Sequence, residues 1–142
     1  MLKVGGKIAY STCSLSPIEN ESVVAAAKLR YGDKIEILKV DLPGFKFQEG
    51  LTNWKVMMNE DFYEEYQHVK GCGLEIHETM FPATYNDSVK SELTKCLRVM
   101  PHHQNTSAFF ITIIQKKAEF SDVIQPKEPI IYKNPLAIQE LS

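Results

Sequence analysis

Hydrophobic and polar positions along the first forty residues predict a strand, a helix and a second strand. Lys7–Ser11 is a short, mixed apolar stretch bounded by a Gly5-Gly6 turn, which is typical of a strand. From Pro17 to about Tyr31 the spacing is helical. The apolar stripe of this helix consists of Val23, Val24, Ala27 and Tyr31. Lys34–Val40 alternates polar and apolar residues, as a strand does. We therefore expect one βαβ-like unit of a parallel sheet.

The middle of the chain, from Asp41 to about Pro82, has a looser pattern with many turn residues, which predicts a loop-rich insertion. Within it, Asn59–His68 is expected to form a short helix with aromatic residues on one face.

Two further strands are predicted near the carboxyl end. Leu97–Pro101 is a short strand stopped by proline, and Ala108–Gln115 is rich in β-branched and aromatic residues. The polar residues 102–107 join them in a hairpin-like connection. Residues 118–142 contain three prolines and no periodicity, so we expect a tail or linker, with one extended piece at Pro129–Tyr132.

Composition indicates a single globular domain. The chain has 142 residues, of which 44% are hydrophobic and 24% charged. No apolar run approaches the roughly 20 residues that span a bilayer, and the start lacks the pattern of a signal peptide. We therefore expect no membrane association. Three cysteines without clustered spacing, Cys13, Cys72 and Cys96, argue for a reducing compartment and against a disulfide framework.

The net charge of −2 is not the basic balance of a stand-alone nucleic-acid binder. Charge is uneven, however, because residues 89–117 carry five basic residues against one acidic residue. The basic ones are Lys90, Lys95, Arg98, Lys116 and Lys117. A local surface that faces phosphates and an ordinary solvated surface explain these lysines about equally well.

Cys13 lies between the end of the first strand and the start of the helix. Ser16 and Glu19 have the spacing of a capping box, with Pro17 at the first helical position, so the helix is expected to start near Ser16. Ligands collect at the carboxyl ends of strands in open α/β sheets, and a nearby helix start favours a thiolate. The alternative is a small buried residue, and the residues alone leave the two readings about equal.

Four stretches carry a resemblance to a known family. Residues 10–15, Tyr-Ser-Thr-Cys-Ser-Leu, are followed by Pro17, Glu19, Asn20 and Glu21. Downstream lie Leu51-Thr52-Asn53-Trp54-Lys55-Val56, Thr79-Met80-Phe81-Pro82 and Cys96-Leu97-Arg98-Val99-Met100-Pro101-His102-His103-Gln104-Asn105-Thr106. Together they resemble the Nop/Sun family of RNA (cytosine-5) methyltransferases, in its eukaryotic tRNA-modifying branch, from about Leu2 to about Lys117.

The resemblance implies an α/β fold, the carboxyl-terminal part of a class I (Rossmann-like) methyltransferase sheet with an antiparallel last strand. It implies that Cys13 is the nucleophile, with Thr12 and Ser14 supporting it, and that the thiolate adds to carbon 6 of cytosine. S-adenosyl-L-methionine is the implied methyl donor and RNA, above all tRNA, the implied partner. Covalent catalysis of this kind needs a thiolate and an unstacked base.

Candidate RNA contacts are Lys55, Arg98, His102 and His103. Both histidines have a bland alternative as polar loop residues, and on extended backbone they would point to opposite faces. Trp54 and Cys96 are expected in the core and Cys72 in a loop. The sequence has no CxxC or HxxxH pattern, so no metal site is expected.

Some family features have no counterpart in the sequence. No Gly-rich turn follows a strand, as a cofactor loop would, and no Pro-Cys pair supplies the family's second cysteine. Ser107-Ala108 stand where the family usually has glycine. We therefore expect residues 1–117 to be the carboxyl-terminal half of a catalytic domain and 118–142 a tail. Alone, such a chain should be inactive, bind the cofactor weakly or not at all, and self-associate through an exposed sheet edge.

Two other functions stay open on the sequence. The first is a non-catalytic RNA- or protein-binding module that kept the fold. The second is an unrelated cysteine hydrolase with His102 or His103 as base. Within the methyltransferase reading, ribosomal RNA is the near alternative to tRNA. The expected location is the nucleus or nucleolus, with the cytoplasm as alternative.

Overall fold

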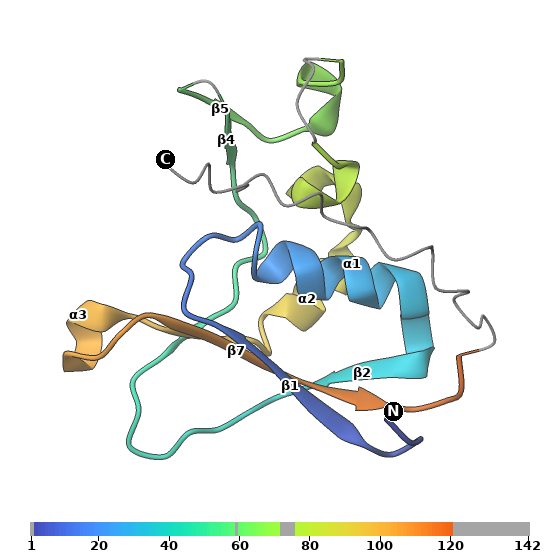
Figure 1. Ribbon diagram of the computed structural model, residues 1–142, viewed down its shortest axis with the longest axis vertical. Coiled ribbons are helices and arrows are strands. Elements are labelled where there is room, and N and C mark those ends of the chain that lie inside the picture. The colour runs from blue at the N-terminus through green and yellow to red at the C-terminus, as the bar shows by residue number, and fades with distance from the viewer. Residues whose placement is uncertain (1, 59, 72–75, 121–142) are drawn as a thin grey trace, which may run out of the picture.

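The computed structural model describes residues 2–58, 60–71 and 76–120 (Figure 1). One sheet contains five strands: β1 (Lys7–Thr12), β2 (Ile35–Leu38), β3 (Gln48–Glu49), β6 (Leu97–Val99) and β7 (Phe109–Lys116). A separate hairpin consists of β4 (Val56–Met58) and β5 (Asp61–Tyr63). The helices are α1 (Glu21–Tyr31), α2 (Asp87–Leu93) and α3 (Pro101–Gln104). Short 3₁₀ turns cover Gly32–Lys34, Tyr66–His68, Glu78–Met80 and Pro82–Thr84. The expected extended piece at Pro129–Tyr132 lies outside the described residues.

Strand β7 is the centre of the sheet. It pairs antiparallel with β1 along one edge, from Lys7↔Gln115 to Thr12↔Phe110. Along its other edge it pairs antiparallel with β2 and then with β6. The expected antiparallel last strand and the β6–β7 hairpin are thus confirmed, as is the mixed α/β fold class.

The expected strand–helix–strand order is confirmed, but the expected parallel sheet is wrong, because the pairs of the five-stranded sheet are antiparallel. β1 and β2 run in the same direction, because both are antiparallel to β7, but β7 lies between them. A helical crossover fixes the relative direction of the two strands it joins and leaves room for another strand between them. β7 can take that central place because its apolar, β-branched residues suit pairing along both edges.

Helix α1 begins at Glu21, four residues later than Pro17, the first helical position of the capping-box pattern. Residues 17–20 form a turn instead, in which the Ser22 N–H donates to the Pro17 carbonyl over 2.9 Å. The Ser16 N–H donates to Ser14 Oγ over 3.0 Å, so this backbone group is satisfied within the preceding loop. The buried face of α1 includes Val24 and Ala25, whereas Val23, expected in the stripe, is 43% exposed.

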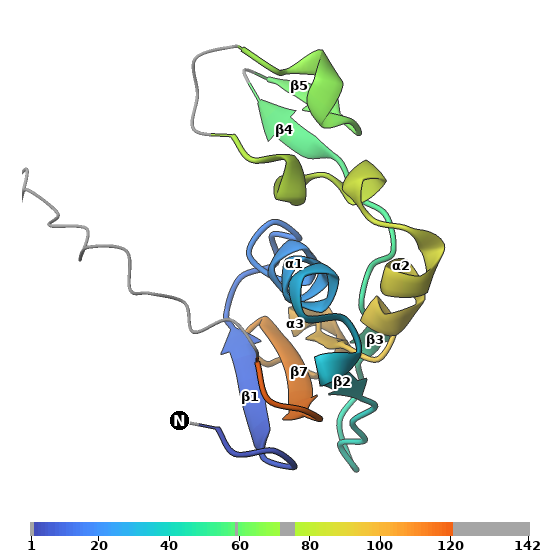
Figure 2. The ribbon, with the colours of Figure 1, turned by 90° about the vertical axis from the view of Figure 1, so that its right-hand side faces the viewer.

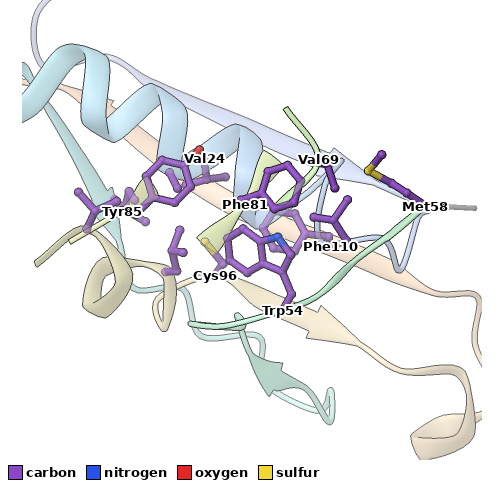
Figure 3. Close-up of a cluster of buried hydrophobic side chains, with 13 residues drawn as sticks. Val24, Trp54, Met58, Val69, Phe81, Tyr85, Cys96 and Phe110 are labelled. Atoms are coloured by element: carbon purple, nitrogen blue, oxygen red, sulfur yellow. The ribbon is translucent and has the colours of Figure 1, made fainter. Parts of the chain in front are cut away.

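Helices α1 and α2 lie over the same face of the sheet (Figure 2). The hydrophobic core lies between these helices and the sheet. Figure 3 shows Trp54, Phe81 and Phe110 together in this cluster, with Cys96 beside them. The Trp54 Nε1–H donates to the Met80 carbonyl over 2.8 Å. The predicted core positions of Trp54 and Cys96 are therefore confirmed; Cys72 lies outside the described residues.

The short helix predicted over Asn59–His68 is wrong. β4 and β5 form a hairpin there, with Met57 opposite Phe62, and Glu60 turns with a φ of 71°. Val56 and Met58 are buried while Met57 between them is exposed, which is the two-residue period of a strand. The aromatic residues that suggested a helical face belong to a strand and the following 3₁₀ turn, so the period was misassigned.

Candidate active site

Cys13 is exposed on the loop that leaves β1 and leads to α1. β1 ends at Thr12, at the edge of the sheet that α1 approaches with its amino-terminal end (Figure 1). The alternative of a small buried residue is wrong for Cys13 and right for Cys96, which has no exposed surface. Burial raises the pKa of the Cys96 thiol to about 11.

The residue after Cys13 is held by both of its backbone groups. The Ser14 N–H donates to Thr12 Oγ1 over 3.2 Å, and the Thr12 hydroxyl donates to Asn20 Oδ1 over 2.6 Å. The Asn20 Nδ2 donates to the Ser14 carbonyl over 2.9 Å, which completes a hydrogen-bonded ring of Thr12, Ser14 and Asn20. Thr12, expected to support the nucleophile, thus hydrogen-bonds to the backbone on the far side of Cys13.

A buried ion pair holds the next residue of the loop. Arg98 Nε and Nη2 donate to the two carboxylate oxygens of Glu21, over 2.6 and 2.5 Å. Arg98 Nη1 donates to the Leu15 carbonyl over 3.0 Å, and the Leu51 N–H donates to Glu21 Oε1 over 2.8 Å. The ion pair therefore connects three segments that are distant in sequence: residues 15–21, Leu51 and Arg98 of β6.

Gly50 allows the Leu51 segment to approach this pair. Its N–H donates to the Cys96 carbonyl over 2.9 Å. A Cβ at position 50 would lie 2.2 Å from the Leu93 carbonyl oxygen, which only glycine avoids.

Tyr10 fastens the end of β1 to the turn before α1, because its hydroxyl donates to the Glu19 carbonyl over 2.6 Å. Burial, helped by the negative charge of Glu19, raises the pKa of Tyr10.

Arg98 is not available for the RNA contact predicted for it. Its side chain is 5% exposed, and its guanidinium group is bonded to Glu21 and Leu15. The strand position explains the error: Arg98 is the middle residue of β6, whose three residues are all buried. The charge pattern groups Arg98 with the lysines of residues 89–117 as surface charge, but Arg98 is buried.

The other predicted RNA contacts lie apart from this network. Lys55 is 59% exposed and forms an ion pair with Glu64 over 3.2 Å. His102 and His103 lie in α3 with ring centroids 4.3 Å apart, edge to face, so the expectation of opposite-facing side chains on extended backbone is wrong. Pro101 at the first helical position explains the helical turn. His103 Nδ1 is buried without a hydrogen-bond partner.

Asn20 and Glu21 were missed as individual site residues, although both belong to the motif that carries the resemblance. Both are completely buried in a chain region where polar residues would ordinarily face solvent. Two adjacent polar residues directly before an apolar helix face were the available signal.

The described residues do not fit a cofactor loop. The glycines with positive φ, Gly5, Gly32, Gly44 and Gly71, each have open space where a Cβ would stand, and none directly follows the carboxyl end of a sheet strand. Of the residues placed by the structure, no three His, Cys, Asp or Glu side chains form a group that could hold a metal ion. No helix in the described ranges is long and apolar enough to cross a membrane.

Comparison with known proteins gives consistent matches over most of the chain. A Saccharomyces cerevisiae multisite-specific tRNA:(cytosine-C(5))-methyltransferase is 37% identical over 129 residues, which are 89% of this chain and 18% of that protein. A Drosophila melanogaster tRNA (cytosine(34)-C(5))-methyltransferase is 36% identical over 126 residues, covering 85% of this chain and 17% of its own length. The chain thus spans less than a fifth of the length of these relatives.

A solved methyltransferase homologue from Pyrococcus horikoshii is 27% identical, with a TM-score of 0.49, over 81% of this chain and 26% of its own. The family described as 16S rRNA methyltransferase RsmB/F matches residues 1–115. The chain therefore belongs to the RsmB/F family, the Nop/Sun family that its motifs resemble.

Proposed function

We propose that this chain supplies the nucleophile of an RNA cytosine-5 methyltransferase and that the nucleophile is Cys13. The observation that carries the proposal is the combination of an exposed thiol with a loop that buried polar side chains hold at Thr12, Ser14 and Leu15. An incidental surface cysteine does not need such support, whereas a reacting sulfur must be held in one geometry.

The proposed chemistry begins with the Cys13 thiolate attacking carbon 6 of the target cytosine. A sulfur–carbon bond forms, and the electron pair of the 5,6 double bond moves to carbon 5, which becomes nucleophilic. S-adenosylmethionine would supply the methyl group to carbon 5, and residues outside this chain would hold it. A base then takes the proton from carbon 5, the freed electron pair re-forms the 5,6 double bond, and the sulfur–carbon 6 bond breaks to release the Cys13 thiolate. The chain's own part is to present the thiolate to the base.

tRNA is the proposed substrate, because the relatives at 36–37% identity are named for cytosine methylation of tRNA. Ribosomal RNA, in the name of the matching family, is the alternative. Lys55, His102 and His103 remain the proposed RNA contacts: Lys55 and His102 are exposed, and the half-buried His103 lies against His102. Each would add a phosphate or base-edge contact rather than chemistry.

Covalent capture tests the proposal. The matched segment of the yeast relative is replaced by the corresponding residues of this chain, and the chimera is incubated with tRNA containing 5-azacytosine, which traps a thiolate added to carbon 6. We expect a protein–RNA adduct stable to denaturant, lost in Cys13→Ser and retained in Cys72→Ser, the matched cysteine substitution elsewhere in the chain. An adduct that persists in Cys13→Ser would refute the assignment.

The rival functions give different results in the same experiment. A non-catalytic module would bind the RNA without forming an adduct, with equal affinity for the Cys13→Ser form. A cysteine hydrolase would react with general thiol electrophiles but not with the cytosine analogue, and its reactivity would depend on His102 or His103.

A further inference from the structure

Asn20 stands at the amino-terminal cap of α1 but does not cap it. Asparagine at this position normally accepts a hydrogen bond from an N–H of the first helical turn. Here its side chain makes no such bond and turns toward the Cys13 loop, completely buried. The helix therefore lacks a side-chain cap, and the Asn20 amide hydrogen-bonds to Thr12 and Ser14 of the loop instead.

Both ends of the Asn20 amide are used in a way that few other side chains can reproduce. Its Oδ1 accepts from the Thr12 hydroxyl and its Nδ2 donates to the Ser14 carbonyl. The Thr12 hydroxyl in turn accepts from the Ser14 N–H. Asn20 therefore holds the Ser14 carbonyl directly and the Ser14 N–H through Thr12. Thr12 and Ser14 are the residues on either side of Cys13.

We propose that Asn20 is a positioning residue for Cys13, acting through Thr12 and Ser14 to fix the backbone that presents the thiol to the target base. The inference rests on the proposed function of Cys13. Asn20 touches neither the sulfur nor the substrate in this role. The requirement is specific: the side chain at position 20 must donate toward Ser14 and accept from Thr12 at once.

Asn20→Asp isolates this requirement, because it keeps the size of the side chain and its acceptor but replaces the donor with a second oxygen facing the Ser14 carbonyl. Asn86→Asp is the matched control. Asn86 caps α2 by accepting from the Val89 N–H over 3.0 Å, a role that a carboxylate keeps. Asn20 is completely buried and Asn86 is exposed, so a difference between the two variants reports the lost donor together with the burial of a carboxyl group. Substitutions at Thr12, which add no charge, separate the two effects.

Hydrogen exchange at the Ser14 amide in this chain is the first readout. We expect Asn20→Asp to accelerate it about tenfold, the effect of losing one hydrogen bond, while Asn86→Asp leaves it unchanged. Thr12→Val should accelerate it as well, and Thr12→Ser, which keeps the hydroxyl, should restore it. The Thr12 pair serves as the second test should Asn20→Asp prevent folding, as judged by circular dichroism. Unchanged exchange at Ser14 in Asn20→Asp and in Thr12→Val would overturn the proposal.

The rate of covalent capture by the chimera is the second readout. We expect Asn20→Asp to lower the maximal rate by about 10²-fold, the order of effect of a misplaced reacting group, with the RNA concentration for half-maximal rate unchanged. An unchanged maximal rate would overturn the positioning role even if exchange accelerates. If the unsubstituted chimera captures no RNA, the proposed function of Cys13 fails, and exchange alone then decides whether Asn20 fixes the loop.

Discussion

Arg98 and Glu21 face each other across 77 residues of sequence as a fully buried, two-bonded ion pair, with Nε–Oε1 and Nη2–Oε2 distances of 2.6 and 2.5 Å. Two further hydrogen bonds join the pair to backbone, from Arg98 Nη1 to the Leu15 carbonyl and from the Leu51 N–H to Glu21 Oε1. A buried pair offsets its desolvation only when geometry and additional hydrogen bonds are this complete. The pair therefore sets the position of the Cys13 loop relative to the Leu51 segment.

Removing one partner of this pair should destabilise the chain strongly. Glu21→Gln leaves the Arg98 charge buried without a counter-charge, and we expect the free energy of unfolding in urea to fall by about 3–5 kcal/mol. The double substitution Glu21→Gln with Arg98→Met should recover part of that loss, because no buried charge is left. A fall below about 1 kcal/mol, the size expected of an exposed pair, would contradict this account. Lys55→Met, which breaks the exposed pair with Glu64, is the control.

Cys96 should make stability depend on alkaline pH. Its folded-state pKa is raised by burial from 9.0 to about 11, so the folded chain holds the thiol proton where the unfolded chain has lost it. The contribution is complete below pH 9 and is lost as pH rises toward 11, about 2–3 kcal/mol in all.

The comparison with Cys96→Ala isolates this contribution, because the raised pKa values of Tyr10 and Tyr85 add their own loss near and above pH 10 in both proteins. We expect the unfolding free energy of the parent to fall more steeply with pH than that of Cys96→Ala. Parallel pH profiles would show that the thiol does not contribute. In alkylation at pH 8, exposed Cys13 should react in the folded chain and Cys96 only after unfolding.

The free edge of β1 should make the chain self-associate. β1 ends the path of the five-stranded sheet and pairs only with β7 among the described strands. Ile8 on this strand is 53% exposed and, with Leu2, Tyr31 and Phe120, lines an apolar cavity of about 260 Å³. An unpaired edge beside apolar surface is a template for association.

Sedimentation at increasing concentration measures this association. We expect Ile8→Lys to shift the chain toward monomer, because a charged side chain on an edge strand disfavours pairing with a strand of another molecule. Val23→Lys, at an apolar position of α1 that is 43% exposed, should leave association unchanged. A clean monomer of the unsubstituted chain at high concentration would rule out the edge as an interface.

Local pattern was a good guide to the elements of the sheet and a poor guide to what joins them. β7, β6 and β2 follow from β-branched content and alternation, and the exposed thiol follows from the motif around Cys13. The place of β7 between β1 and β2 depends on pairing between residues 75 to 108 positions apart, which no local period encodes.

The errors at the site have a related cause. The Ser16–Glu19 spacing predicts a cap, but the loop backbone finds its partners in Asn20 and Ser14, and α1 starts later. Arg98 counts as a surface charge until Glu21 is placed beside it. A buried polar network consists of partners remote in sequence, so its members cannot be told from surface residues one at a time.

S-adenosylmethionine should bind weakly or not at all to this chain alone. A cofactor of this kind needs a Gly-rich turn after a strand, where backbone N–H groups approach the ligand closely. The positive-φ glycines of the described residues instead precede β1, follow α1 or lie in loops, and Gly50 is packed against Leu93 and Cys96. Calorimetric titration of the chain beside the yeast chimera measures the difference. We expect binding by the chimera only, and the same cofactor affinity in its Cys13→Ser form, because the proposed nucleophile contacts the base. Micromolar binding by the chain alone would mean that its own loops form the cofactor site, and Gly5-Gly6 and Gly71 would then be the first positions to substitute.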